Sequence, residues 1–212
     1  MTRAQAIPGQ TVFIVDDEES VCQSLRWLLE SIELRVETFR SAEAFLAHFR
    51  DGRPGCIVLD VRMPGMSGAE LMDYLAEHRI RTPVIFLSAH GDVPLAVRAM
   101  KRGAIDFLEK PYNNQQFLEC VQHALARDAL DRSNRDRIST FETSLKLLTA
   151  REREIFDHVV QGHSNKLIGA TLGISSRTVE AHRARLMRKM RVGSLAELLQ
   201  TAFSLGFPVE PH

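Results

Sequence analysis

Five short runs of apolar and β-branched residues recur in the first half of the chain, and helical patterns separate them. The runs lie at 11–15, 34–39, 56–60, 83–88 and 105–109. The helical patterns lie at 18–32, 41–49, 67–78 and 93–102, and another begins near Asn113. Strands that alternate with helices in this way pair in parallel and leave helices on both faces of one sheet.

The runs "CIVLD" and "PVIFLS" are almost wholly apolar, as strands that are covered on both faces must be. Five strand–helix units suit the flavodoxin-like strand order 2-1-3-4-5. The sequence therefore predicts an α/β fold with a doubly wound, five-stranded parallel sheet.

A polar segment ends this pattern. Residues 131–137 are nearly all charged or polar, so no core can form there, and we expect 127–146 to be a solvated helical linker that continues the fifth helix. The region beyond it is helical throughout. We predict a first domain at 1–126, the linker at 127–146 and a smaller all-α domain at 147–212.

Charge divides unevenly between the two halves. The chain of 212 residues is formally neutral, but residues 1–126 carry a net charge of −4 and residues 127–212 a net charge of +4. The basic half is a candidate for nucleic-acid binding. Cys22, Cys56 and Cys120 lack metal-binding spacing, so we expect reduced core thiols in a cytoplasmic protein. No apolar run is long enough to span a bilayer.

Charged and hydroxyl side chains follow the predicted strands at the points where they end. Asp16 and Asp17 follow the first strand, Asp60 ends the third, Ser88 ends the fourth and Lys110 follows the fifth. Ligands of open α/β sheets bind at the carboxyl ends of the strands, where the strand order reverses. We therefore expect these five side chains to meet at one crevice.

The chemistry of this crevice favours phosphoryl transfer. Clustered carboxylate oxygens suit Mg²⁺, and an ammonium beside them offsets their repulsion. Phosphoryl transfer depends mainly on positioning and charge neutralisation, and a carboxylate can act as its nucleophile. Taken one at a time, such residues are more often helix caps or surface charges, and the prediction depends on their convergence.

Four segments, "VDDEES", "VLDVRMPGMSG", "FLSAHGD" and "AIDFLEKPY", resemble the receiver domain of bacterial two-component response regulators over residues 11 to about 126. The resemblance implies that Asp60 accepts a phosphoryl group from a histidine kinase. It also implies that Asp16, Asp17 and Asp60 hold Mg²⁺ together with the backbone carbonyl of Arg62.

The same resemblance assigns the remaining residues of the crevice. Ser88 and Lys110 would bind the phosphoryl oxygens, the peptide before Pro111 would be cis, and Phe107 matches the aromatic switch position. Phosphorylation adds charge and acceptors, so Ser88 would move inward and vacate space for Phe107.

The segment around 93–107 is expected to change its surface in response. Val93, Val97, Met100 and Lys101 could then form a dimer contact. The simpler alternative is that Val97 and Met100 pack on the sheet, and we expect this of at least one of them.

Capping residues divide the basic half into helices. Thr149 and Glu152 form a capping box, Gly162 ends that helix, Ser164 begins a short one, and Gly173 makes a turn. Ser175 or Ser176 then begins a third helix, and a last helix spans 194–205. Two helices joined by a tight, glycine-containing turn indicate a helix-turn-helix.

The third helix carries six cations and one anion between Arg177 and Arg191. If Val179, Leu186 and Met190 point inward, the opposite face is basic and interrupted by two alanines, which would let the backbone approach a groove. A solvated surface is the alternative for such a charge run. The residues expected to contact DNA are Lys166, Arg177, Thr178, Glu180, Ala181, His182, Arg183, Ala184, Arg185, Arg188 and Lys189.

The segments "LTAREREI", "NKLIGATLGIS" and "RTVEAHRARLMRKM" resemble the LuxR/NarL-type helix-turn-helix of transcription regulators over residues 148–205, and most of all its FixJ branch. Glu180 stands where many relatives have lysine. Base contacts are therefore not transferred from those relatives.

Together these features predict a cytoplasmic response regulator that is phosphorylated on Asp60, forms a homodimer and binds double-stranded promoter DNA. We expect activation through recruitment of RNA polymerase, because no ATPase domain is present. We expect no enzyme activity beyond accepting a phosphoryl group and autodephosphorylation, and no association with a membrane.

Two other functions fit the sequence less well. A Mg²⁺-dependent phosphatase would need a general acid beside its nucleophile, but the second residue after Asp60 is Arg62. A regulator that senses a small molecule would need an apolar pocket, and the predicted crevice is all charge.

Overall fold

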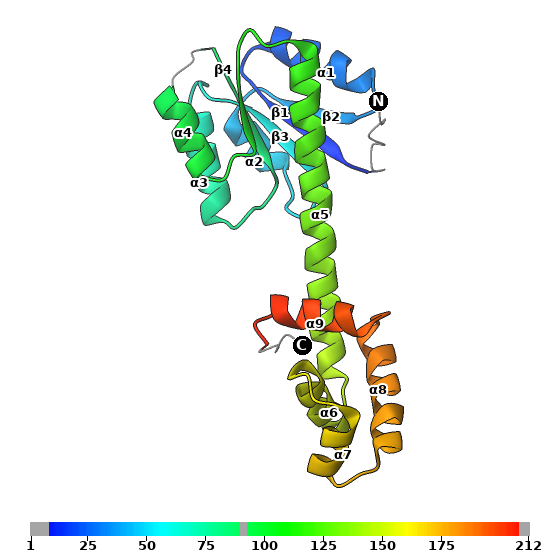
Figure 1. The fold of residues 1–212 in the computed structure, drawn as a ribbon. Helices are drawn as coiled ribbons and strands as arrows, with labels where there is room; N and C mark the ends of the chain where they lie inside the picture. The colour runs from blue at the N-terminus through cyan, green and yellow to red at the C-terminus, as the bar shows by residue number, and fades with distance from the viewer. Residues whose placement is uncertain (1–8, 90–92, 208–212) are drawn as a thin grey trace. The chain divides into compact units, whose positions relative to one another are not determined.

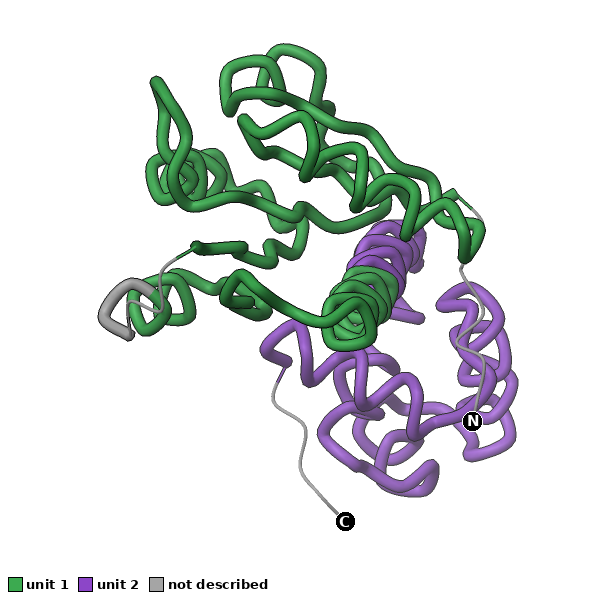
Figure 2. The backbone as a smooth tube through the Cα atoms, turned by 90° about the horizontal axis from the view of Figure 1, so that it is seen from above, with its two compact units in different colours: residues 1–131 green, residues 132–212 purple. Residues whose placement is uncertain are grey.

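The computed structural model describes residues 9–89 and 93–207, and the side chains of residues 93–95 lie outside that description. The chain divides into two compact units, residues 1–131 and residues 132–212, which we call unit 1 and unit 2 (Figure 2). The division falls inside the segment 127–146 that was predicted as the linker.

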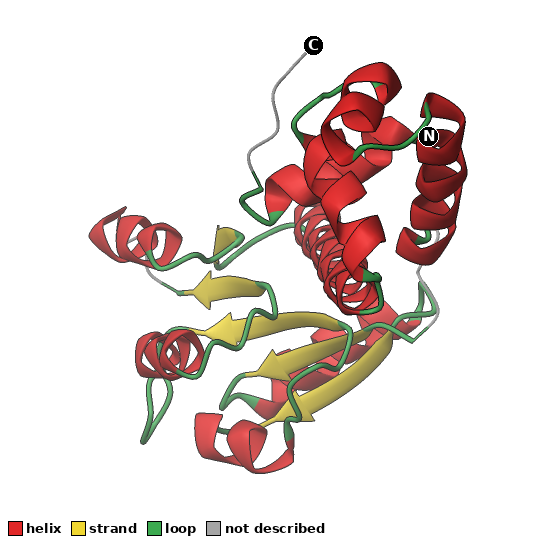
Figure 3. Ribbon diagram, turned by 90° about the horizontal axis from the view of Figure 1, so that it is seen from below, coloured by secondary structure: helices red, strands yellow, loops and turns green. Residues whose placement is uncertain are grey.

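Unit 1 contains a five-stranded sheet in which all paired strands are parallel (Figure 3). Its strands are β1 (Thr11–Val15), β2 (Arg35–Phe39), β3 (Gly55–Asp60), β4 (Val84–Ser88) and β5 (Asp106–Glu109). Their order is β2-β1-β3-β4-β5, which confirms the predicted topology.

Helices of unit 1 follow the strands along the chain (Figure 1). They are α1 (Glu19–Glu30), α2 (Ala42–His48), α3 (Gly68–Glu77), α4 (Val93–Lys101) and the first part of α5 (Asn114–Lys146). Alternate strand residues enter two separate cores. Val12 and Ile14 pack with the apolar faces of α1 and α5, and Phe13 and Val15 pack with those of α2 and α3.

The buried surface of α4 differs from the expectation. Ala99 is buried in the core that α3 shares, whereas Val97 is 46% exposed and Met100 48% exposed. The prediction that at least one of the two packs on the sheet was wrong, because the phase of the helix directs Ala99 inward instead. The side chain of Val93 lies outside the described residues.

The helix α5 runs without a break through the predicted linker. The linker is not solvated along its whole length. Asp128 is buried in unit 1 and accepts a hydrogen bond from the N–H of Gly55 at 2.8 Å, while Phe141 and Ser144 are buried in unit 2. The expectation of a solvated segment therefore holds for its centre and fails near both ends.

Unit 2 packs the end of α5 with four short helices: α6 (Ala150–Val160), α7 (Asn165–Leu172), α8 (Ser176–Met190) and α9 (Leu195–Ser204). The capping box of Thr149 and Glu152 is formed, and Ser164, Ser175 and Ser194 are the N-caps of the next three helices. Of the two serines considered for α8, Ser175 is therefore the cap.

The turn between α7 and α8 depends on two glycines. Gly173 ends α7 in the left-handed conformation, at φ 67°, which suits a residue without a side chain. A Cβ atom at Gly169 would lie 2.7 Å from the carbonyl oxygen of Ile174. The backbone of α7 can therefore approach the turn closely, as a helix-turn-helix requires.

Candidate functional site

Two buried carboxylates meet one ammonium at the carboxyl ends of the strands. The Nζ of Lys110 donates to Asp16 Oδ2 at 2.9 Å and to Asp60 Oδ1 at 2.8 Å. Asp16 is 1% exposed, Asp60 7%, and the Lys110 side chain 18%. The strand order brings these residues together from β1, β3 and β5, although up to 94 positions separate them along the chain.

Backbone donors fix the two carboxylates from their other sides. The N–H of Glu18 donates to Asp16 Oδ1 at 2.9 Å, and the N–H of Arg62 donates to Asp60 Oδ2 at 2.7 Å. All four carboxylate oxygens are thus engaged, which orients both groups. Asp17, the next residue after Asp16, is partly exposed.

Burial and charge act against each other in this cluster. Burial raises the pKa of the Asp16 carboxyl above its usual range, and the bonds from Lys110 and the Glu18 N–H offset this only in part. For Lys110, burial disfavours the ammonium, but its hydrogen bonds to Asp60 and Asp16 outweigh that cost and raise its pKa. The charged ammonium form of Lys110 is therefore favoured beside Asp60.

The other predicted residues of the crevice lie beside this cluster. Ser88 is buried at the end of β4, and its carbonyl accepts the N–H of Lys110 at 2.7 Å. The peptide between Lys110 and Pro111 is cis. Phe107 is half-buried on β5, against the core that α3 and α4 share. Of the five side chains predicted from strand ends, those of Asp16, Asp60 and Lys110 are in direct contact, and Ser88 ends a neighbouring strand.

One residue near this site escaped prediction. The guanidinium of Arg40 donates to the backbone carbonyl of Asp17 at 2.9 Å and pairs with Glu19, so it holds the loop after β1. Arg40 follows β2, which lies beside β1 in the sheet. The predicted strand order could have indicated that Arg40 lies near Asp17, because residues that follow neighbouring parallel strands lie at the same edge of the sheet.

The second functional surface is the exposed side of α8. Val179, Leu186 and Met190 are buried, which confirms the helix orientation. Of the residues expected to contact DNA, His182 and Arg183 are half-buried and the others are exposed, namely Lys166, Arg177, Thr178, Glu180, Ala181, Ala184, Arg185, Arg188 and Lys189.

Three polar side chains on α8 have partners within unit 2. Arg183 donates to Asn165 Oδ1 at 2.8 Å, and Thr178 shares a hydrogen bond with the Ser175 hydroxyl at 2.8 Å. Lys189 donates to Glu152 Oε2 at 2.6 Å. These side chains help to hold the helix in place, in addition to any contact with DNA.

Family models match both units. Residues 12–122 match the response regulator receiver domain, and residues 146–202 match the bacterial regulatory proteins of the luxR family. No helix within the described ranges is long and apolar enough to cross a membrane.

Curated relatives span nearly the whole chain. The transcriptional regulatory protein TdiR of Thauera aromatica is 48% identical over 90% of this chain and 84% of its own length. The transcriptional regulatory protein FixJ of Rhizobium meliloti (strain 1021) is 44% identical over 93% of this chain and 97% of its own length.

Solved structures agree with these relatives. The response regulator StyR is similar at 43% identity and a TM-score of 0.77, over 92% of this chain and 99% of its own. Full-length FixJ from B. japonicum is similar at 36% identity and a TM-score of 0.56, over 94% of this chain and 98% of its own. The chain therefore belongs to the two-component response regulators that join a receiver domain to a LuxR-type DNA-binding domain.

Proposed function

We propose that Asp60 is the residue that accepts a phosphoryl group from a histidine kinase. The bridge from Lys110 to Asp16 and Asp60 carries this proposal, because it keeps a cation beside a buried nucleophile. A carboxylate oxygen of Asp60 would attack phosphorus while the bond from phosphorus to the donor breaks. Lys110 would then neutralise charge on the transferred group, which is the main requirement of this chemistry.

Mg²⁺ is the cofactor that the donor set fits. Asp16, Asp17 and Asp60 offer only oxygen ligands, and with Lys110 they leave a formal excess of two negative charges, which one divalent cation would balance. Among the described residues, no group of three acidic, histidine or cysteine side chains stands ready around a metal. The carbonyl of Arg62 would be a further ligand. When bound, Mg²⁺ supplies charge neutralisation at the phosphoryl oxygens.

Labelling with acetyl phosphate and Mg²⁺, followed by intact-mass spectrometry, tests the acceptor. We expect one phosphoryl adduct that hydroxylamine removes, as it does from an acyl phosphate. Asp60→Asn should remove the adduct, while Asp51→Asn, at an exposed turn residue, should keep it. A full adduct on Asp60→Asn would refute the assignment.

The same chemistry distinguishes a regulator from a phosphatase. Arg62 stands two residues after Asp60, where a phosphatase would need a carboxylic acid, and its N–H only orients Asp60. We therefore propose that the chain turns over no external phosphate ester and only removes its own phosphoryl group slowly. Repeated turnover of p-nitrophenyl phosphate would contradict this.

The output we propose is activation of transcription in the cytoplasm by a phosphorylated homodimer that binds promoter DNA and recruits RNA polymerase. The exposed Val97 and Met100 on α4 support an apolar dimer contact, and the basic exposed side of α8 supports DNA binding. Sedimentation with and without acetyl phosphate tests the dimer, and transcription in vitro from a bound promoter tests the direction of control.

A further inference from the structure

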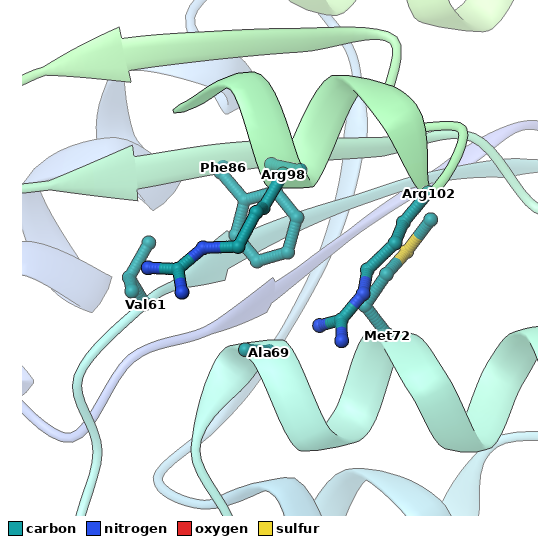
Figure 4. Close-up of a pocket in the computed structure, with 7 residues that line it drawn as sticks. Val61, Ala69, Met72, Phe86, Arg98 and Arg102 are labelled. Carbon is teal, nitrogen blue, oxygen red and sulfur yellow. The ribbon is translucent and has the colours of Figure 1, made fainter. Parts of the chain in front are cut away.

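A small apolar cavity lies in unit 1, apart from the carboxylate crevice. It has a volume of about 200 Å³ and lies between α3 and α4, against β4 (Figure 4). Its walls are made by Val61, Met72, Phe86 and Ala99, all of which are buried. Concave recesses that are lined mainly by apolar side chains are where proteins most often bind small molecules.

The size of the cavity limits what could enter. An engineered cavity of ~150 Å³ lined by aliphatic and aromatic side chains stays dry and binds benzene. The cavity described here therefore has room for one ring, or a similar aliphatic body, with one small substituent.

Two arginines at the rim of the cavity favour a ligand that carries a negative charge. Arg98 and Arg102 extend from α4 across the opening toward Val61 and α3 (Figure 4). Arg102 is paired with Asp73 at 3.0 Å, whereas the side chain of Arg98 has no hydrogen bond or ion pair among the described residues. Among the described residues of the rim, one positive charge is thus in excess, on a guanidinium whose planar fork matches a carboxylate.

We propose that this cavity binds a small apolar monocarboxylate, with the hydrocarbon body against Phe86 and Met72 and the carboxylate on Arg98. The apolar walls would favour burial of the hydrocarbon body, and the Arg98 guanidinium would gain a partner of opposite charge. Neither a bare anion nor a neutral hydrocarbon satisfies both parts of the site.

Occupancy would bear on phosphorylation, a consequence that rests on the proposed function. Val61 follows Asp60 directly, and Arg98 and Ala99 belong to α4, whose exposed surface is expected to respond to phosphorylation. A ligand held between α3 and α4 would favour the arrangement in which the cavity is open. It should therefore slow labelling by acetyl phosphate, and phosphorylation should in turn weaken ligand binding, because coupling between two sites acts in both directions.

Binding can be measured on the full chain without reference to phosphorylation. The probes are benzoate, benzamide as a neutral molecule of the same shape, and acetate as a charge without the ring. In methyl NMR titrations we expect benzoate to shift the signals of Val61, Ala69 and Met72 and to bind at least ten-fold more tightly than the other two.

Variants locate the site. Ala69→Leu should fill the cavity and abolish benzoate binding, and Arg98→Gln should reduce the preference for benzoate over benzamide to less than two-fold. Arg81→Gln, at an exposed arginine outside the cavity, should change neither. Equal binding of benzoate and acetate, or full benzoate binding by Ala69→Leu, would overturn the proposal. If Ala69→Leu fails to fold, methyl shifts remote from Val61, Ala69 and Met72 in the unaltered chain would overturn it as well.

The effect on phosphorylation is a separate measurement. Saturating benzoate should slow acetyl phosphate labelling of Asp60 by at least two-fold, and Ala69→Leu should be insensitive to benzoate. Benzoate that binds in the cavity without changing the labelling rate would refute the coupling but leave the site in place. If acetyl phosphate never labels the chain, the proposed phosphorylation of Asp60 is refuted, and the proposed ligand site is not affected.

Discussion

Lys189 donates a hydrogen bond to Glu152 across 2.6 Å, whereas the side chain of its neighbour Arg188 is exposed and makes no such bond among the described residues. Glu152 is itself part of the capping box that begins α6, so Lys189 joins the end of α8 to the start of α6. Two adjacent cations that were both expected to contact DNA therefore differ in their surroundings, since Lys189 has a partner in unit 2 and Arg188 has none among the described residues.

Arg188→Ala and Lys189→Ala should separate DNA binding from stability. Arg188→Ala should weaken binding to all sequences about equally and lower the slope of log K against log salt by ~1, since one phosphate contact is lost. Lys189→Ala should lower the melting temperature of unit 2 and leave that slope unchanged. DNA-binding titrations at several salt concentrations measure the slope, and calorimetry measures the melting temperature. If Lys189→Ala lowers the slope and leaves the melting temperature unchanged, Lys189 contacts DNA and does not stabilise unit 2.

The pair also predicts how unit 2 responds to acid. The hydrogen bond from Lys189, aided by Thr149, lowers the pKa of Glu152 to about 2. The group's folded pKa is below its unfolded value, so its stabilisation is complete above about pH 4.3 and is lost as the pH falls toward 2. We expect this to remove about 2 kcal/mol, allowing for the exposure of Lys189. Melting temperatures between pH 7 and pH 2.5 should fall less steeply in Glu152→Gln, which is already less stable at pH 7.

Glu180 should contribute to sequence discrimination rather than to affinity. A carboxylate near anionic DNA lowers affinity unless it accepts a hydrogen bond, which cytosine N4 can donate. Glu180→Ala should therefore relax discrimination at one base pair by about 1–3 kcal/mol, while non-specific binding stays equal or tightens. The measurement is the affinity for a series of operators that each differ at one base pair, and Glu142→Ala on α5 is the control. Unchanged preferences at every position would mean that α8 is oriented differently on DNA.

Lys110 should stabilise unit 1 as well as serve the phosphoryl group. Lys110→Met would leave Asp16 and Asp60 buried without their cation, which should cost about 3 kcal/mol of unfolding free energy at pH 7. The loss should shrink as the pH falls, because burial raises the pKa of the Asp16 carboxyl and favours its neutral form. Urea unfolding at pH 7 and pH 4 tests this, and Lys101→Met, at the exposed end of α4, is the control. Adding Asp16→Asn and Asp60→Asn should restore most of the stability, and no recovery would contradict the explanation.

Asp17 should matter for metal binding and little for folding. It is partly exposed and follows the buried Asp16, so Asp17→Asn should weaken Mg²⁺ binding by at least ten-fold with little change in melting temperature. Titration calorimetry with Mg²⁺ measures the affinity, and Glu30→Gln, at the far end of α1, is the control. Unchanged affinity in Asp17→Asn would remove this residue from the metal site.

The sequence by itself determined the elements and the positions of the reactive side chains. Apolar runs such as Val12–Val15 are removed from water only in a sheet that is covered on both faces. The capping residues Thr149, Ser164 and Ser194 accept hydrogen bonds from the first N–H groups of their own helices. These are local effects, which neighbouring residues decide. Because all parallel strands end at one edge, the strand order then placed Asp16, Asp60 and Lys110 together.

Only the tertiary structure decided which partners those side chains have and which faces they expose. The bond from Lys189 to Glu152 spans 37 positions, and the bond from Gly55 to Asp128 spans 73. Ala99, rather than Val97 or Met100, faces the core, and the cavity beside it results from how α3 and α4 pack. Periodicity gives a helix one apolar side, but the exact phase, the pairing of distant charges and the gaps between elements depend on the distances between packed elements, which no local pattern encodes.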